Sequence, residues 1–271
     1  MASPSKIAAQ MFTLRDFTKT PADIAATCAK IRKIGFEAVQ ASALGPIEPQ
    51  EFARILQAEG LTCCATHVGF EQLKANPQKI AEEHRLWGCQ HTAVPSLPGE
   101  FRSAEGFATF AKELTALAKV YRPLGLTISY HNHAFELTRY GQATGLEILY
   151  NNSRPSLVKA ELDTYWIQYG GGDPAAWITR LGKRQPLVHL KDMGFVDDKI
   201  VMAEVGEGNL NWPAILKALR RVHTQWYIIE QDVCRRDPFE SLRISLEHLK
   251  SWGVDAPDEP TSADAPSPAS A

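Results

Sequence analysis

Residues 125–133 read GLTISYHNH and predict the fold more directly than any other part of the chain. Gly125 stops a helical pattern, the apolar run after it predicts a β-strand, and His131 and His133 stand where that strand ends. Three more polar residues directly follow short apolar runs of the same kind: Asp163, His189 and Glu230. Because these side chains are far apart in sequence, only a fold that gathers its strand ends brings them together.

Short apolar runs alternate with amphipathic segments along almost the whole chain. The predicted strands are 7–11, 36–40, 61–66, 91–94, 126–130, 157–162, 186–190 and 226–229. The predicted helices are 21–34, 51–59, 77–87, 104–121, 144–151, 174–181, 213–221 and 239–252. Strands joined by helices run parallel. About eight strand–helix units in a chain of this length are what a closed (β/α)8 TIM barrel of the α/β class requires.

An open doubly wound sheet is the alternative fold. Such a sheet normally carries a glycine-rich phosphate loop after its first strand, but residues 10–16 contain no glycine. We therefore expect a single barrel domain over residues 1–254. Residues 255–271 are rich in Pro, Ser, Ala and Asp, and this composition predicts a flexible tail with almost nothing to bury.

The charge balance gives no reason to expect a nucleic acid or a membrane as partner. The 271 residues carry a formal net charge of −2 at pH 7. No apolar run reaches the roughly 18 residues that span a bilayer, and the N-terminus lacks the apolar core of a signal peptide. The five cysteines are an odd number without zinc or disulfide spacing. We expect a cytoplasmic protein with free thiols, and the exposed helices of such a barrel are compatible with a homo-oligomer.

The strand ends of a TIM barrel converge on the face that holds the active site. Imidazole and carboxylate side chains at four of these ends predict one divalent metal ion, bound by His131, Asp163, His189 and Glu230. Mixed nitrogen and oxygen ligands suit Mn, Zn, Co, Fe or Mg better than Ca, and the sequence does not rank these metals. Each residue also has a structural alternative. Asp163 can cap a helix that begins near Trp166, for example, and Glu230 can pair with a lysine.

Other polar side chains near the predicted strand ends are candidates for binding the substrate. They are Gln10, Arg15, Gln40, His67 and Trp166. Core packing is the alternative for Trp166, and a plain surface position is the alternative for Arg15. Lys191 lies two residues after His189 and therefore faces the same side of the strand.

Two aspartates and one glycine-containing segment after the strand ends have two interpretations each. Asp192 and Asp232 either orient metal ligands or are solvated loop charges. Residues 204–212 form a structural loop more readily than a loop that closes on a substrate, because two glycines and a helix cap occur in them.

Several motifs at these positions resemble the xylose isomerase-like TIM barrels, a group of sugar phosphate isomerases/epimerases. They are YHNHAFE at 130–136, ELDTYW at 161–166, VHLKD at 188–192, VGEG at 205–208, IEQD at 229–232 and QMFTLRD at 10–16. The group also holds ketose 3-epimerases, inosose dehydratases, 3-dehydroshikimate dehydratases and endonuclease IV. The motifs cover nearly the whole chain except its tail. They are specific for the superfamily but do not identify the substrate.

The resemblance implies one divalent metal held by a Glu, an Asp, a His and a second Glu from strands five to eight. Asp163, His189 and Glu230 match the last three ligands. His131 stands where the epimerases have the first Glu. In the epimerases two glutamates exchange a proton on opposite faces of one carbon, so symmetric two-Glu epimerisation is not expected here. His133 matches a histidine that binds substrate or acts as a base in the dehydratases.

The implied chemistry is metal-assisted proton abstraction beside a carbonyl, through an enediolate. The candidate bases are Glu230, His131 and His133, and Lys191 is a candidate proton donor. Return of the proton makes a sugar or cyclitol isomerase or epimerase. Loss of a β-group makes a dehydratase or lyase acting on a keto-inositol or a 3-keto-glycoside. A non-catalytic sugar-binding barrel is the remaining alternative, whereas few histidines and no basic excess argue against an endonuclease.

Overall fold

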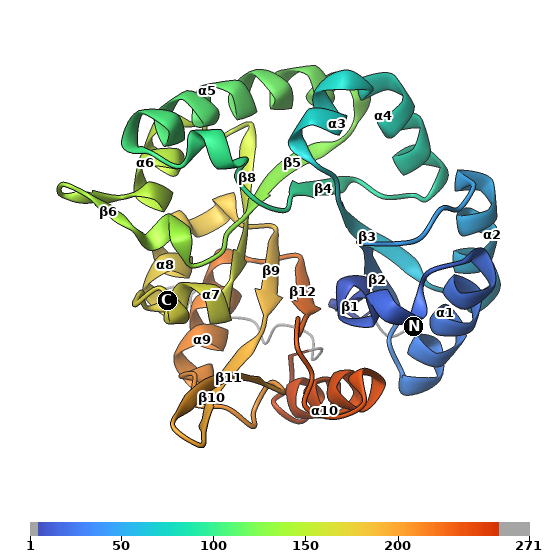
Figure 1. Cartoon of the computed structure of the whole chain (residues 1–271). Coiled ribbons are helices and arrows are strands. Elements are labelled where there is room, and N and C mark those ends of the chain that lie inside the picture. Colours follow the sequence, from blue (N-terminus) through green and yellow to red (C-terminus); the bar gives the residue numbers. More distant parts are fainter. Residues whose placement is uncertain (1–4, 255–271) are drawn as a thin grey trace, which may run out of the picture.

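The computed structural model describes residues 5–254. Eight of their strands close into a parallel barrel, which lies inside a ring of helices (Figure 1). The barrel strands are β1 (Ile7–Gln10), β2 (Ala38–Ala41), β3 (Thr62–His67), β4 (His91–Val94), β5 (Thr127–His131), β8 (Val158–Asp163), β9 (Leu187–Leu190) and β12 (Trp226–Ile229). The predicted TIM barrel is confirmed. Pairing of β1 with β12 closes the sheet and excludes the open doubly wound alternative. Residues 255–271, expected to form a flexible tail, lie outside the described residues.

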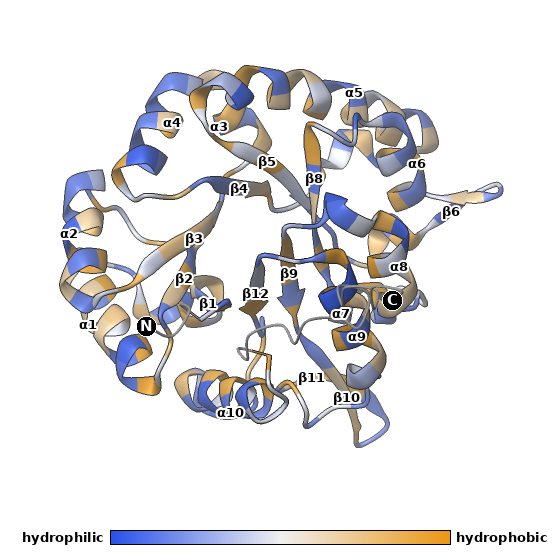
Figure 2. Ribbon diagram, turned by 180° about the vertical axis from the view of Figure 1, so that it is seen from behind, coloured by the Kyte–Doolittle hydropathy of each residue, from blue (hydrophilic) through white to orange (hydrophobic). Residues whose placement is uncertain are grey.

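Helices connect the strands and cover the outside of the barrel. The main ones are α1 (Pro21–Ile34), α2 (Pro49–Glu59), α4 (Pro77–Leu86), α5 (Ala104–Tyr121), α6 (Gly145–Asn152), α8 (Pro174–Leu181), α9 (Trp212–Val222) and α10 (Pro238–Ser251). Shorter ones are α3 (Phe70–Ala75), α7 (Thr164–Tyr169), η1 (Met11–Phe17), η2 (Gly99–Phe101), η3 (Arg122–Leu124), η4 (Phe135–Leu137) and η5 (Gly182–Arg184). Figure 2 shows hydrophilic and hydrophobic residues alternating along these helices, as amphipathic packing on the barrel requires. Within residues 5–254, no helix is both long and apolar enough to cross a membrane.

Left-handed glycines end the helical segments before three of the strands. The φ angles are 112° at Gly35, 63° at Gly60 and 82° at Gly125. A residue with a side chain pays about 1–2 kcal/mol in this region, so glycine favours a sharp stop there. At the other end of α1, Thr20 and Asp23 form a reciprocal capping box. These local signals set where each strand begins, and therefore which residues reach its far end.

Inward-facing side chains change from apolar to polar along the barrel strands. Small and aliphatic residues fill the interior near the strand beginnings: Ala8, Ala38, Cys64, Leu187 and Ile228. Two residues further along four of these strands, the chain carries Gln10, Gln40, His189 and Glu230. Because side chains alternate with a period of two, these polar residues point into the same interior. The barrel therefore has an apolar floor and a polar upper part.

Two β-hairpins follow barrel strands and were not expected from the sequence. They are β6 (Arg139–Tyr140) with β7 (Ala143–Thr144), and β10 (Asp192–Val196) with β11 (Lys199–Ala203). Asp197 and Asp198 have φ angles of 50° and 58° at the second turn. Positive φ at both central residues is typical of a type I′ turn, for which two aspartates are a weaker signal than Asn-Gly.

Candidate metal centre

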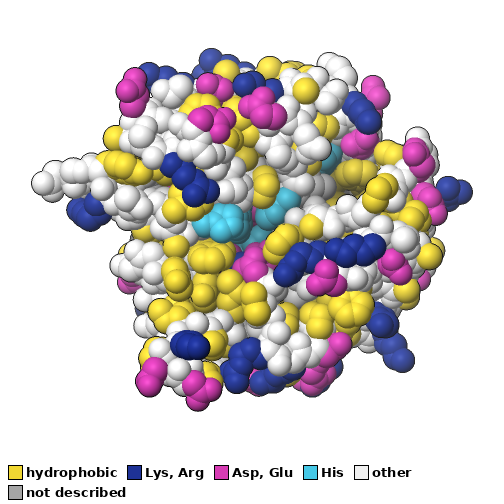
Figure 3. Space-filling model, in the orientation of Figure 1, with side chains coloured by type: hydrophobic (Ala, Val, Ile, Leu, Met, Phe, Trp, Pro, Cys, Tyr) yellow, Lys and Arg dark blue, Asp and Glu magenta, His cyan; other side chains and the backbone are white. Residues whose placement is uncertain are grey.

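Four side chains meet at the carboxyl ends of neighbouring strands. His131 ends β5, Asp163 ends β8, His189 lies in β9 and Glu230 directly follows β12. One ligand atom from each lies within 4.8 Å of the ligand atoms of the other three. All four residues are buried, with at most 4% of the surface of any one exposed. Figure 3 shows histidine side chains at the bottom of a central hollow on this face.

His131 turns one ring nitrogen toward the centre of this cluster. Its Nδ1 donates to the carbonyl oxygen of Pro95 at 3.1 Å, which leaves Nε2 as the atom that faces the other side chains. His131 Nε2 lies 3.4 Å from Asp163 Oδ2, and neither atom has a hydrogen-bond partner in the described part of the chain. Two buried polar atoms that face each other without a hydrogen bond are destabilising unless a cation or a proton lies between them. The nitrogen and oxygen donors therefore fit a divalent metal ion.

Asp163 uses its two oxygens for different purposes. Oδ1 accepts a hydrogen bond from the backbone nitrogen of Trp166 at 2.9 Å and caps α7. Oδ2 faces His131 and the cluster centre. The structural alternative considered for Asp163 is therefore real, but it does not exclude a metal-binding role. Capping holds the carboxylate plane in one orientation and turns Oδ2 toward the cluster, where it also lies 3.0 Å from Lys191 Nζ.

Lys191 is a fully buried cation beside the candidate ligands. Its Nζ lies 3.0 Å from Asp163 Oδ2, 2.8 Å from Glu230 Oε2 and 2.6 Å from Asp232 Oδ2. Burial lowers the pKa of Lys191, but the three carboxylates outweigh it and raise the pKa above its usual value. Burial likewise raises the pKa of Asp163 and of Glu230, but the attraction of Lys191 leaves both pKa values below normal. The ammonium and both ligand carboxylates are therefore charged at neutral pH.

His189 joins the candidate ligands to a polar layer deeper in the barrel. Its Nδ1 lies 2.7 Å from Glu230 Oε2, and its Nε2 lies 2.7 Å from Gln40 Oε1. Burial lowers the pKa of His189, but the carboxylates of Glu161 and Glu230 raise it to about 10. Without a bound metal ion, both ring nitrogens therefore carry a proton near neutral pH.

The deeper layer is a continuous hydrogen-bonded network. Gln10 Nε2 donates to Gln40 Oε1 at 2.7 Å, and Gln40 Nε2 donates to Glu161 Oε1 at 2.6 Å. His67 Nε2 completes it by donating to Glu161 Oε2 at 2.7 Å. Gln10 and Gln40 are completely buried. The structure thus places these two proposed substrate contacts against other side chains, and their contact with a substrate stays a prediction.

Glu161 was not expected among the functional residues. It precedes Asp163 by two positions in β8, so both side chains point into the barrel. Burial raises the pKa of Glu161, but His189 and His67 outweigh it and hold the pKa well below its usual value. One ligand atom each from His67, Glu161 and His189 also lies within 4.8 Å of the other two. The period of two, applied backwards from Asp163, is the signal that identifies Glu161.

His133 and Trp166 lie beside the candidate ligands. Their ring centroids are 5.3 Å apart, and Lys191 Nζ lies 5.5 Å from the centroid of the Trp166 ring. His133 Nδ1 and Trp166 Nε1 are buried and unpaired among the residues that the structure describes. Burial and the nearby His131 lower the pKa of His133 to about 3, so its imidazole is neutral. Two unpaired polar atoms next to the ligands are thus available to a substrate.

Arg15, a proposed substrate contact, is held by the backbone. Its guanidinium donates to the carbonyl oxygens of Phe12 at 3.0 Å and Asp232 at 2.9 Å. These bonds connect the segment after β1 to the segment after β12. Arg15 therefore braces one side of the site, and its contact with a substrate remains a prediction.

Asp192 anchors the loop at 204–212 from inside the protein. Its Oδ2 accepts hydrogen bonds from the backbone nitrogens of Gly206 at 2.9 Å and Gly208 at 3.1 Å, and from Trp212 Nε1 at 2.6 Å. Asp192 is fully buried, so the solvated-charge interpretation is wrong. The anchoring supports a structural role for the loop.

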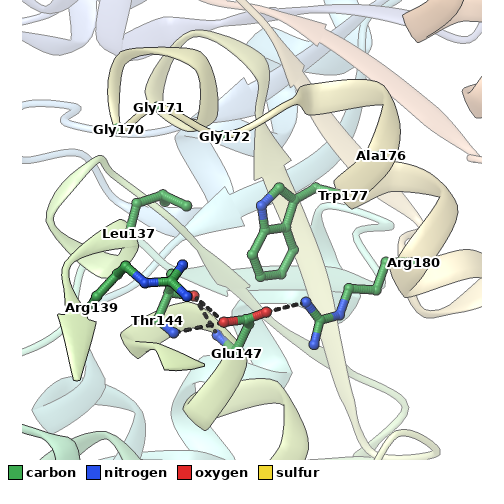
Figure 4. A pocket seen from close by; sticks show the side chains of 10 residues that line it. All are labelled: Leu137, Arg139, Thr144, Glu147, Gly170, Gly171, Gly172, Ala176, Trp177 and Arg180. Atoms are coloured by element: carbon green, nitrogen blue, oxygen red, sulfur yellow. Dashed lines mark hydrogen bonds and ion pairs between the residues drawn. The ribbon is translucent and has the colours of Figure 1, made fainter. Parts of the chain in front are cut away.

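A separate pocket of about 330 Å³ lies beside the β6–β7 hairpin and the turn before α8 (Figure 4). Glu147 and Arg180 point toward one another across it and are paired. The other Glu147 oxygen accepts from the backbone nitrogen of Thr144 at 2.7 Å, as part of the cap of α6. None of the four candidate ligands lines this pocket. Both oxygens of the Glu147 carboxylate are thus bound to other parts of the protein. The cluster in the barrel therefore remains the candidate site.

The fold and these side chains define a TIM barrel with a candidate divalent-metal site. The chain belongs to the xylose isomerase-like TIM barrel family, whose sequence model matches residues 28–252. The family includes sugar epimerases and dehydratases, and the buried cluster of histidine, aspartate and glutamate is consistent with its typical metal site.

Two curated proteins show how distant the similarity is. The inosose dehydratase of Geobacillus kaustophilus is 22% identical over 263 residues, which cover 81% of this chain and 84% of that protein. The rhizopine catabolism protein MocC of Rhizobium meliloti is 24% identical over 179 residues, which cover 59% of this chain. The match spans only 54% of MocC, about half its length.

Solved structures share the fold over nearly the whole chain. A sugar phosphate isomerase/epimerase from Parabacteroides distasonis has a TM-score of 0.76 and 20% identity, with 92% of this chain and 95% of that chain covered. The D-allulose 3-epimerase from Methylomonas sp. has a TM-score of 0.66 and 17% identity, with 93% and 99% covered. At such identities the likeness extends to the fold alone.

Proposed function

We propose that this chain is a divalent-metal-dependent isomerase or epimerase that removes a proton beside the carbonyl of a sugar or cyclitol. The observation that carries the proposal is the buried cluster of His131, Asp163, His189 and Glu230, in which His131 Nε2 and Asp163 Oδ2 face each other without a hydrogen bond. These four residues would hold one divalent ion, and Mn, Zn, Co, Fe and Mg all suit their nitrogen and oxygen donors.

A bound metal would supply Lewis acidity to a substrate carbonyl and a neighbouring hydroxyl. Glu230 and His133 are candidate bases, because Glu230 is ionised and His133 is neutral with an unpaired Nδ1. The lowered pKa of each makes it a weak base until a substrate or metal changes its surroundings. His131 is the third candidate base. Lys191 remains charged and is the candidate donor of a hydrogen bond or proton. Trp166 Nε1 offers a donor to a substrate hydroxyl.

A dehydratase or lyase acting on a keto-inositol or a 3-keto-glycoside is the second candidate. The asymmetry of the site favours it, because His131 stands where the epimerases have a glutamate. An imidazole would then face one side of the substrate carbon and a carboxylate the other side. A proton removed on one side need not be replaced from the other. The similarity to a protein named inosose dehydratase points in the same direction.

Proton exchange in deuterated water separates these functions. Mn²⁺-loaded protein is incubated with a panel of ketoses, keto-inositols and 3-keto-glycosides, and deuterium beside the carbonyl is measured by mass spectrometry. We expect exchange with at least one compound, and the product structure then distinguishes isomerisation from elimination. Asp163→Asn is the control, because it removes a candidate ligand. Sugar binding without exchange by any compound would leave the non-catalytic barrel as the better explanation.

We also propose that the protein acts in the cytoplasm on a small-molecule substrate without a nucleic-acid or membrane partner. The near-neutral net charge of −2 supports the absence of a nucleic-acid or membrane partner. Size-exclusion chromatography with light scattering would measure the molar mass and show whether the protein forms a homo-oligomer.

A further inference from the structure

In the network beneath the candidate ligands, the donor and acceptor of each hydrogen bond can be assigned, starting from Glu161. Both Glu161 oxygens accept hydrogen bonds, Oε1 from Gln40 Nε2 at 2.6 Å and Oε2 from His67 Nε2 at 2.7 Å. A carboxylate without a proton accepts only, so the group of Gln40 that faces Glu161 must be its NH₂. The amide oxygen of Gln40 is thereby turned to the opposite side.

That amide oxygen determines the hydrogen on His189. Gln40 Oε1 lies 2.7 Å from His189 Nε2 and also accepts from Gln10 Nε2 at 2.7 Å. Since an amide oxygen only accepts, His189 Nε2 carries a hydrogen. The nitrogen left to offer a lone pair is Nδ1, which lies 2.7 Å from Glu230 Oε2 and 3.9 Å from Asp163 Oδ2.

We propose that Glu161 and Gln40 are positioning residues that make Nδ1 of His189 the metal-binding atom. The inference rests on the proposed metal-dependent function. Neither residue faces the centre of the ligand cluster, and both act through His189. Without an obligate acceptor at Glu161, the Gln40 amide can turn over and present NH₂ to His189, which favours the tautomer with its hydrogen on Nδ1. Partners of this kind typically change metal affinity about 10- to 100-fold.

The same residues offer a competing interpretation as a second metal site. His67, Glu161 and His189 have ligand atoms within 4.8 Å of one another. The facing atoms of these residues are already hydrogen-bonded, however, with His67 Nε2 on Glu161 and His189 Nε2 on Gln40. The upper cluster differs, because His131 Nε2 has no hydrogen-bond partner among the described residues. We therefore assign support, not metal binding, to the lower layer.

Three variants separate orientation from charge. Glu161→Gln keeps the shape but removes the obligate acceptor, and Gln40→Leu keeps the Glu161 charge but removes the amide. Each should weaken Mn²⁺ binding about 10- to 100-fold. In the double variant Gln40→Glu/Glu161→Gln the polarity is restored, because the carboxylate at position 40 accepts from His189 and from the new amide. Its affinity should return to within about threefold of the original protein.

Ser42→Ala is the matched control. Ser42 Oγ lies 3.3 Å from His67 Nδ1, at the edge of the network. Its removal leaves the hydrogen bonds that join Glu161, Gln40 and His189 intact. Mn²⁺ affinity should therefore change by less than about twofold, because the control perturbs the layer without touching the path that orients the imidazole.

Two measurements decide the proposal. Isothermal titration calorimetry with Mn²⁺ gives affinity and stoichiometry, and ¹⁵N NMR of the Zn²⁺-loaded protein identifies the coordinating nitrogen of His189. We expect one equivalent of metal, coordination through Nδ1 and a protonated Nε2. Coordination through Nε2, a Glu161→Gln variant that binds as tightly as the original, or a second equivalent lost in that variant would each overturn the proposal. A double variant no tighter than Glu161→Gln would do the same.

Failure of the proposed function is a separate outcome. If the original protein binds no divalent metal, the metal-dependent function is wrong, but the orientation can still be tested by NMR without metal. At a pH above the pKa of His189, about 10, the imidazole is neutral, and an Nε2 proton that disappears in Glu161→Gln would support the positioning role. Its absence from the original protein, or its persistence in the variant, would contradict that role.

Discussion

Binding of Mn²⁺ to this protein is expected to strengthen steeply with pH. His189 Nδ1 lies 2.7 Å from Glu230 Oε2. Burial lowers the pKa of His189, but the carboxylates of Glu161 and Glu230 raise it to about 10. A metal ion takes the lone pair of this nitrogen, so the proton must leave before the ion binds. Binding near neutral pH therefore releases a proton from His189.

The size of the effect follows from that pKa. At about pH 7 the proton is held about 3 pH units below its pKa, and removing it costs about 4 kcal/mol. Affinity should rise about tenfold for each pH unit, or about 100-fold between about pH 6 and about pH 8. Burial raises the pKa of Asp163 and of Glu230, but Lys191 keeps both pKa values below normal. Both carboxylates stay ionised over this range and add no pH dependence.

Calorimetric titration in buffers of different ionisation enthalpy measures both affinity and proton release. We expect about one proton per Mn²⁺ at about pH 7. In chelator-treated protein the raised pKa of His189 stabilises the fold fully below about pH 6.5, the unfolded value, and this stability is lost as the pH rises to about 10. The increase in Tm caused by Mn²⁺ should therefore grow with pH. Affinity that changes less than about threefold over the range, or binding without proton release, would refute the reasoning.

Three substitutions test other parts of the site. Lys191→Met should tighten Mn²⁺ binding by about tenfold or more, because no ammonium then competes for the oxygens of Asp163 and Glu230, and it should slow substrate deuterium exchange; weaker binding in a titration would contradict this. Asp163→Asn should lower Mn²⁺ affinity by at least about 100-fold while far-UV circular dichroism stays unchanged, because the amide oxygen still caps α7; tight binding by the variant would count against Asp163 as a ligand. Asp192→Ala should lower the free energy of unfolding in urea by about 3 kcal/mol, because buried donors including Trp212 Nε1 lose their acceptor. Mn²⁺ affinity should change little. An unchanged unfolding midpoint would show that Asp192 does not anchor the loop.

Much of the candidate site could be predicted because strand ends can be located locally. His131, Asp163 and Glu230 each come at or directly after an apolar run, and parallel connections leave only one face where such residues meet. Glu161 was missed because it lies inside an apolar run, where the strand signal outweighed a single carboxylate. The hairpin turn at Asp197 and Asp198 was missed because its backbone conformation is not specific to that pair.

The sequence by itself determined the barrel and the residues that reach its carboxyl-terminal face, because glycine stops, capping residues and hydrophobic periods are local properties. Only the tertiary structure decided what those residues do to one another. It turned Nε2 of His131 and Nδ1 of His189 toward Asp163 Oδ2, and it placed the amide oxygen of Gln40 against Nε2 of His189, beneath the candidate ligands. The physical reason is that a histidine's tautomer depends on hydrogen-bond partners, and Gln40 and His189 are 149 residues apart in sequence.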